Sequence, residues 1–313
     1  MMGIADAAVK HPAESERRPS RHFFRRHHDG IIAAIILTPI IGWWFIISGG
    51  PMLFGLSLGV FDWHNVLESP KWNGIQNFLT FFQDPNYRLT LWNAVWIGLL
   101  TAAITNLFGF GAGLLMNLPI RGRGFYRTIW YVPAVTSGAA VTQIFNMWLE
   151  PNQFGLVNNI LQKIGFHPII WQYSTGWMIF WIIFYSVWRG IGVSAILWLA
   201  GLQSINPQLV EAAKIDGAGK WGRFRYVTLP GLRPFITFIV ITACIGAVQI
   251  YEQVLFISGG GPFGSTNVLM SQIYKDAFID FNLGMAGAGA FIMAVVIFGL
   301  VLVNWVTREK EEE

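Results

Sequence analysis

The chain has 313 residues, of which 54% are hydrophobic and only 12% carry a charge, with a net charge of +4. Soluble domains carry about 25% charged residues, and one core of ordinary size could not bury this much apolar surface. The composition therefore excludes an ordinary soluble protein and predicts an integral membrane protein, while the single cysteine, Cys244, excludes an internal disulfide.

Six stretches are apolar and long enough to cross a bilayer, which requires roughly 20 residues of helix. In chain order they cover about 31–60, 91–118, 128–149, 176–202, 234–257 and 283–306. A basic segment precedes the first stretch, as in a signal peptide, but the stretch is too long to be a cleavable apolar region and is expected to be a retained span. The predicted fold is all-α, with six transmembrane helices between terminal tails at 1–30 and 307–313.

The distribution of basic residues predicts the orientation of these spans. Of the 21 Lys and Arg residues, sixteen lie in the two tails and in the second and fourth connections, and four lie in the remaining connections. Positive charge is retained in the cytoplasm, so both termini are expected to be cytoplasmic. The basic segment at residues 22–28 is expected to bind anionic lipid headgroups.

The fourth connection, residues 203–233, carries the most informative local pattern and is called the coupling loop below. Asn206 can cap a helix and Pro207 suits its first turn. Gly217 stands where a helix ends in a left-handed residue, and a second helical run follows that Pro230 is expected to stop. The pattern predicts two short helices meeting at a glycine, with an exposed and partly apolar surface suited to docking another protein.

The segment EAAKIDGAGKWGRFRYVTLP, residues 211–230, resembles the EAA loop of the permease subunits of bacterial ABC importers. The Gly259–Pro262 sequence GGGP and the segment from Trp72 to Trp96 resemble the carbohydrate branch of that family, the maltose- and glycerol-phosphate-type permeases. The resemblance implies a type I importer permease fold in a bacterial cytoplasmic membrane. It also implies half of a translocation pathway for a carbohydrate, expected to be an oligosaccharide, neutral or acidic.

The resemblance further implies partners and residue roles. A second permease subunit, two ATPase subunits and an external solute-binding protein would complete the importer. The loop would insert into a cleft of the ATPase, with Glu211 pairing with a basic group there and Gly217 forming the elbow. Small side chains would allow close approach. The full set expected to act in coupling is Glu211, Ala212, Ala213, Asp216, Gly217, Ala218 and Pro230.

The sequence lacks a phosphate-binding motif of its own. Gly219-Lys220 is followed by Trp221 in a helical context, whereas a phosphate-cradling loop requires G-x-x-x-x-G-K-[ST] after a strand. No HExxH motif occurs, and no acid and base pair or metal ligand set can be assembled within the spans. We therefore expect no catalytic residue, no metal, no bound cofactor and no nucleic acid partner, with ATP and Mg held by the separate ATPase.

Polar residues inside the spans are costly and mark candidate positions along a transport pathway. The fourth span contains Trp188, Arg189 and Gly190. In the fifth span, the spacing of Gln249, Glu252 and Gln253 places all three on one helix face, with Tyr251 beside them. These seven residues are predicted to contact substrate. Asn146 and Gln143 are weaker candidates.

Two alternatives remain open at this point. Arg189 and Glu252 could pair with each other, and Gln or Asn side chains could hold helices together without touching substrate. The chain could also be a stand-alone transporter coupled to an ion gradient. That function would need a titratable relay, for which Glu252 and Arg189 are thin evidence.

Overall fold

The computed structural model describes residues 21–65, 67–119, 121–152 and 154–312, so most of the predicted N-terminal tail lies outside the described residues. The described chain is helical apart from a two-stranded hairpin and its connections. It divides into two compact units, residues 1–54 and 55–313.

The first unit contains a long helical run. Helix α1 (Arg21–Trp44) continues through a π-helical turn, η1 (Phe45–Gly49), into α2 (Gly50–Ser57), which extends into the second unit. Pro39 lies inside α1 without ending it. Large apolar side chains such as Ile35 and Trp43 are exposed, as expected for a surface that faces lipid.

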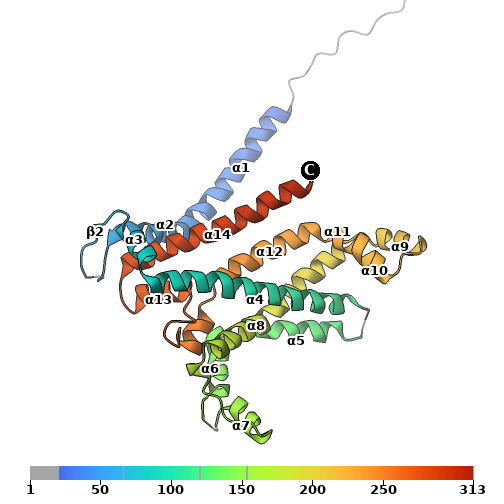
Figure 1. The fold of residues 1–313 in the computed structure, drawn as a ribbon. Helices are drawn as coiled ribbons and strands as arrows, with labels where there is room; N and C mark the ends of the chain where they lie inside the picture. Colours follow the sequence, from blue (N-terminus) through green and yellow to red (C-terminus); the bar gives the residue numbers. More distant parts are fainter. Residues whose placement is uncertain (1–20, 66, 120, 153, 313) are drawn as a thin grey trace, which may run out of the picture. The chain divides into compact units, whose positions relative to one another are not determined.

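The second unit is a bundle built on four long helices: α4 (Pro85–Asn117), α8 (Thr175–Ser204), α12 (Arg233–Val248) and α14 (Leu283–Glu312). Helices α4 and α8 lie side by side (Figure 1). A Cβ added at Gly113 would stand 3.0 Å from the Trp198 side chain, so small residues set this close spacing. A cluster of buried apolar side chains joins Ile97 of α4 to Ile182 of α8 and Ile292 of α14.

Shorter elements connect and flank these helices. They are η2 (Leu58–Val60), β1 (Phe61–Asp62), β2 (Lys71–Trp72), α3 (Gln76–Gln83), α5 (Arg123–Val135), α6 (Gly138–Trp148), α7 (Leu156–Lys163), η3 (Trp171–Tyr173), α9 (Pro207–Ile215), α10 (Lys220–Arg223), η4 (Phe224–Thr228), α11 (Leu229–Gly231), η5 (Val254–Ser258) and α13 (Leu269–Phe278). Strands β1 and β2 are antiparallel, with Phe61 opposite Trp72.

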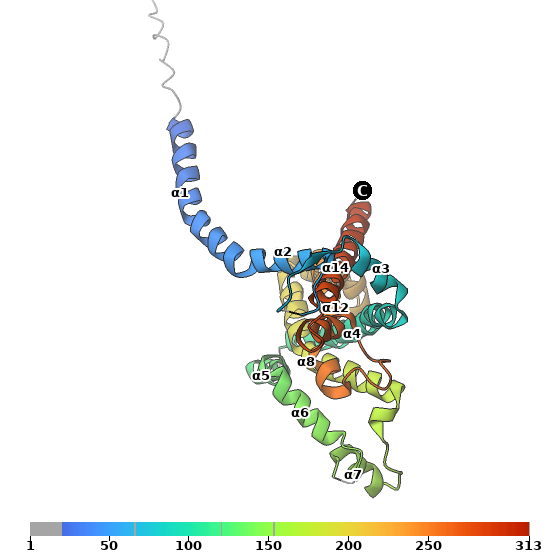
Figure 2. The same cartoon turned by 90° about the vertical axis from the view of Figure 1, so that its left-hand side faces the viewer.

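Figures 1 and 2 show how the connections are arranged around the bundle. Helices α9 and α10, together with the connection from α4 to α5, lie at one end, whereas α3, α13 and the β-hairpin lie at the other (Figure 1). The connections that the basic residues assign to the cytoplasm are thus at one end, as the predicted orientation requires.

Among the described residues, four helical runs are long and apolar enough to cross a membrane: Ile32–Val60, Pro85–Asn117, Thr175–Ser204 and Leu283–Val303. They correspond to the first, second, fourth and sixth predicted spans. A fifth run, 220–231 followed by 233–248, passes only as a pair of helices bent by 65°.

Two predicted spans are not continuous helices, which corrects the sequence-based expectation. The span expected at 128–149 is divided into α5 and α6, because Thr136 is extended and Ser137 caps α6 by accepting a hydrogen bond from the Ala140 amide at 3.5 Å. The span expected at 234–257 is interrupted at 249–251, after which the chain turns helical again and enters η5.

The small residues at the start of α14 allow close contact with the preceding segments. A Cβ at Gly287 would stand 2.5 Å from the Gly59 amide nitrogen, and one at Gly284 would overlap the Phe61 carbonyl oxygen. The side-chain amide of Asn77, on α3, donates to the Gly59 carbonyl at 3.0 Å and to the Phe61 carbonyl at 2.8 Å. The start of α14 is therefore fixed against η2, β1 and α3.

Candidate functional site

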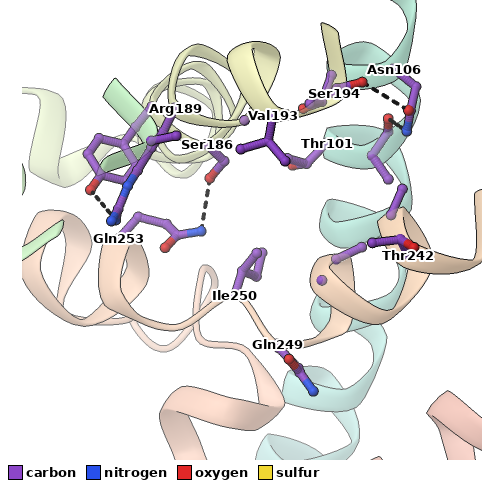
Figure 3. Close-up of a pocket in the computed structure, with 18 of the residues that line it drawn as sticks. Thr101, Asn106, Ser186, Arg189, Val193, Ser194, Thr242, Gln249, Ile250 and Gln253 are labelled. Atoms are coloured by element: carbon purple, nitrogen blue, oxygen red, sulfur yellow. Dashed lines mark hydrogen bonds between the residues drawn. The ribbon is translucent and has the colours of Figure 1, made fainter. Parts of the chain in front are cut away.

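A cavity of about 470 Å³ lies between α4, α8, α12 and the interruption that follows α12. Its walls combine apolar side chains with hydroxyl, amide and charged groups (Figure 3). The polar lining residues are Thr101, Thr105, Asn106, Tyr185, Ser186, Arg189, Ser194, Thr242, Gln249, Tyr251, Glu252 and Gln253.

Helical periodicity explains why these residues meet. Along α8, Ser186, Gly190 and Ser194 recur every four residues and so face the same side. Thr101 and Thr105 of α4 have the same spacing. Gly190 lies directly against α4, because an added Cβ would stand 2.9 Å from the Thr105 side chain.

An ion pair stands at one side of the cavity. The Arg189 Nη1 atom lies 3.0 Å from Glu252 Oε2, with 27% and 35% of the two side chains exposed. Arg189 also donates from Nη1 to the Tyr185 hydroxyl at 3.3 Å and from Nη2 to the Thr136 carbonyl at 3.1 Å. The Tyr185 hydroxyl in turn donates to the Gly138 carbonyl at 3.2 Å. The guanidinium charge is thus satisfied within the chain.

The structure brings together six of the seven residues predicted to contact substrate: Arg189, Gly190, Gln249, Tyr251, Glu252 and Gln253. Trp188 is not among the lining residues, and its ring packs 5.9 Å from that of Phe145. The expectation that Gln249, Glu252 and Gln253 share one face of a continuous helix is wrong, because the helix is interrupted between Gln249 and Glu252.

The amide residues have distinct surroundings. Gln253 donates to the Ser186 hydroxyl at 2.9 Å, whereas Gln249 is exposed and lies apart from Arg189 in Figure 3. Asn146 donates to the Phe256 carbonyl at 2.6 Å and so links α6 to η5. Neither Asn146 nor Gln143 lines the cavity, so the two weaker candidates are not part of it.

Hydroxyl-bearing and amide residues of α4, α8 and α12 also line the cavity and were not among the predicted site residues. Ser194 donates to Asn106 Oδ1 at 3.1 Å across α4 and α8, and Thr242 lies on α12 beside the cavity. Thr101 is buried, and its hydroxyl has no hydrogen-bond partner among the described residues. The four-residue spacing of small polar residues within apolar spans was the available signal.

The coupling loop folds largely as predicted. The Asn206 side chain caps α9 by accepting from the Gln208 amide at 2.9 Å, and Pro207 occupies the first turn. Gly217 adopts a φ of +82°, and the Ala218 amide donates to the Ala213 carbonyl at 2.9 Å, which closes α9. The elbow between α9 and α10 thus requires the left-handed conformation that glycine adopts without strain.

The second helical run passes through α10, η4 and α11 and ends at Gly231, one residue after Pro230, close to the predicted stop. The bend of 65° follows α11 and separates it from α12. The coupling loop therefore continues directly into a helix that lines the cavity.

The surface of the coupling loop is exposed and partly apolar. Glu211, Ala212, Asp216 and Gly217 are exposed, whereas Ala213 and Ala218 are partly buried. Large apolar side chains stand open beside them, with Ile215 86% and Trp221 73% exposed. Among the described residues, Glu211 forms no ion pair. The surface has the character of a protein docking site.

The fold and the two sites together define a membrane permease, with a polar cavity within the helices and a docking surface at one end. The chain belongs to the family of binding-protein-dependent transport system inner membrane components, whose sequence profile matches residues 105–310. This places it in the inner membrane, as predicted, and membership of a binding-protein-dependent family does not support the stand-alone ion-coupled alternative.

Several relatives are permease proteins named for sugar transport. The chain is 36% identical to the sulfoquinovosyl glycerol transport system permease protein SmoG of Agrobacterium fabrum, over 72% of each chain. It is 34% identical to the lactose transport system permease protein LacF of Rhizobium radiobacter, over 73% of this chain and 77% of the other. These relatives confirm the resemblance to the carbohydrate branch that the sequence indicated.

A solved structure shares the fold. A chain of a bacterial ABC transporter involved in the import of the acidic polysaccharide alginate matches with a TM-score of 0.79, covering 93% of this chain and 99% of that one, at 24% identity. This likeness confirms the type I importer permease fold.

Proposed function

We propose that this chain forms half of the translocation pathway for an uncharged oligosaccharide, and that the sugar passes along the cavity between α4, α8 and α12. The proposal is carried by one observation. Residues chosen from two distant parts of the sequence line a single cavity whose remaining polar groups are hydroxyls and amides. Such groups donate to and accept from sugar hydroxyls, and the apolar walls suit the faces of sugar rings.

The charge of the cavity supports an uncharged sugar. Among its described lining residues the only charged side chains are Arg189 and Glu252, which neutralise each other. A carboxylate, sulfonate or phosphate on the substrate would find no free cation to offset the loss of its hydration. The names of the relatives include both charged and uncharged substrates, so the cavity is more informative here than the relatives are.

The coupling loop supports a separate source of energy. Glu211 is exposed and available to a basic group on an ATPase, and Gly217 sets the angle at which α9 meets α10. Ala212, Ala213 and Ala218 permit close approach, Asp216 lies at the end of α9, and Pro230 lies in α11, just before the bend into α12. Movement imposed on α9 and α10 would therefore be transmitted to the cavity wall.

The complete importer in this proposal has four kinds of component. This chain and a second permease enclose the pathway, and an external solute-binding protein delivers the sugar. Two ATPase subunits hold ATP and Mg and dock on the coupling loops. Transport proceeds by alternating access, because closure of the ATPase pair on ATP moves the coupling loops and hydrolysis returns them.

The experiment measures sugar-stimulated ATP turnover per assembled complex in proteoliposomes. Gln249→Leu and Thr242→Val each remove polar contacts from the cavity and should lower this turnover roughly twofold to tenfold, as expected for one hydrogen bond of about 0.5–1.5 kcal/mol. Thr237→Val is the matched control. Thr237 lies on the same helix and, like Thr242, donates to the carbonyl four residues earlier, but it does not line the cavity.

Unchanged turnover in both cavity variants would contradict the proposed pathway. Stimulation by a uronate-bearing oligosaccharide in preference to its uncharged counterpart would contradict the proposed substrate class.

A further inference from the structure

The Arg189–Glu252 pair stands where two interrupted spans approach the same continuous helix. One interruption lies between α5 and α6, at residues 136–137, and the other lies at residues 249–251. Arg189 is on α8, which runs unbroken from 175 to 204. From this arrangement we infer that Arg189 and Glu252 are positioning residues: they hold the two interruptions in register with α8, and they do not bind the sugar themselves.

Residues of α8 contact backbone carbonyls on both sides of the first interruption. An interrupted helix leaves carbonyl groups without helical partners, and such groups are costly in an apolar surrounding. Arg189 Nη2 donates to the Thr136 carbonyl at 3.1 Å, at the end of α5. The Tyr185 hydroxyl, which accepts from Arg189, donates to the Gly138 carbonyl at the start of α6. The Gly138 carbonyl also accepts from the Thr142 hydroxyl at 3.1 Å within α6. Arg189 thus satisfies a carbonyl at the end of α5, and Tyr185 adds a contact to the start of α6.

Glu252 connects the second interruption, at residues 249–251, to the same arginine. Glu252 resumes the chain after residues 249–251 and lies 3.0 Å from the same guanidinium. The segment that follows is held to its neighbours as well, by Gln253 on the Ser186 hydroxyl and by Asn146 on the Phe256 carbonyl. The segment from Glu252 through η5 is therefore anchored to α8 and α6, whereas α12, before the interruption, follows from the coupling loop. Arg189 links the anchored part to the first interruption.

The start of α6 lies directly against the ion pair. A Cβ built on Gly138 would overlap both Glu252 Oε2 and Arg189 Nη1. Only glycine at this position lets the start of α6 approach the ion pair so closely. The guanidinium is therefore enclosed by α6, α8 and the resumed chain, and its hydrogen bonds point into the protein. Three of its five N–H donors are engaged within the chain, on Tyr185, Glu252 and Thr136.

The test is a double-mutant cycle in the reconstituted complex, with transport rate per assembled complex and the sugar KM as separate readouts. Arg189→Gln leaves Glu252 without a counter-charge, and Glu252→Gln leaves Arg189 without one. Each single variant should lower the maximal rate by roughly tenfold with the KM unchanged, since couplings of this order are common for contacting charged residues. The Arg189→Gln/Glu252→Gln double variant should recover several-fold relative to Arg189→Gln, because losing one partner is worse than losing both.

A glycine pair gives an independent arm. Gly138→Ala should lower the maximal rate in the same way, whereas Gly124→Ala on α5, which has open space around its Cβ position, should not. If Gly138→Ala does not assemble, the charge cycle still decides.

Two results would overturn the inference. A raised KM in Arg189→Gln, with a double variant at least as impaired as the worse single variant, would make Arg189 a direct sugar ligand. Normal rates per assembled complex in every variant, with only the yield reduced, would leave the pair a structural contact alone. Neither result contradicts the proposed sugar pathway, because Gln249 and Thr242 test that pathway separately.

Discussion

Asp276 of α13 offers a quantitative test of the structure at the end of the bundle opposite the coupling loop. Its side chain is buried, and its carboxylate accepts hydrogen bonds from the Tyr87 hydroxyl at 3.0 Å and from Gln272 at 2.8 Å. Among the described residues it forms no ion pair, and the charges of Asp280 and Lys275 have smaller, opposing effects on its pKa than burial has. Burial raises the pKa of Asp276 from 3.8 to about 6.

The direction of the pH effect follows from that raised pKa. The folded chain binds the Asp276 proton more tightly than the unfolded chain, so the stabilisation is fully present below pH 3.8 and is lost as the pH rises through about 6. At about 1.36 kcal/mol for each pKa unit, the difference between 3.8 and 6 gives an upper limit of about 3 kcal/mol. The charged form of Asp276 therefore destabilises the junction of α13 with α4 at neutral pH.

Asp276→Asn removes this charge while keeping the size of the side chain. About 1.4 kcal/mol of that limit falls between pH 5 and 7.5, because the unfolded chain is already largely ionised at pH 5. Over this range the variant should gain at most roughly 3–6 °C in the Tm of the purified protein relative to the wild type. Asp280→Asn is the matched control, since Asp280 is exposed on the neighbouring segment. The reasoning would be refuted by a Tm difference between Asp276→Asn and the wild type that is the same at pH 5 and pH 7.5.

Two further predictions concern glycines. Gly217→Asp should abolish sugar-stimulated ATP turnover while the spans still insert, because the φ of +82° at position 217 strains a residue with a side chain and α10 would be redirected. Gly219→Ala is the control, since Gly219 has a φ of −64° and open space around its Cβ position. Uptake unaffected by Gly217→Asp would disprove the role of the elbow. Gly287→Leu should prevent stable assembly, measured by yield in detergent, because the side chain would overlap the backbone at 58–59, whereas Gly299→Leu should assemble normally since its Cβ position is open. Equal yields from those two variants would show that α14 does not pack on η2 as described.

The sequence predicted the features that depend on local chemistry. The spans matching α4, α8 and α14 follow from runs of apolar residues, and the elbow of the coupling loop follows from Asn206 and Gly217. The interruption between α5 and α6 was missed although Ser137 is a good helix cap, because hydrophobicity alone merges two short apolar helices into one span.

The second interruption has no comparable local signal. Residues 249–251 include no proline or glycine, and the helix resumes at Glu252, which pairs with Arg189 on α8. A contact between residues 63 positions apart decides this feature, so periodicity within the segment could not show it. Six of the seven predicted site residues nevertheless line the cavity, because polar residues inside apolar spans are retained where they line a cavity or find a partner.

The central claim is that the coupling loop receives mechanical work from a separate ATPase. The most direct measurement is uptake of labelled oligosaccharide into proteoliposomes containing this chain, its partner permease and the ATPase, with the solute-binding protein outside. The account predicts uptake that requires ATP on the side of α9 and α10 and that disappears when the ATPase is omitted. Uptake by the permease chains alone, driven by an ion gradient, would contradict it.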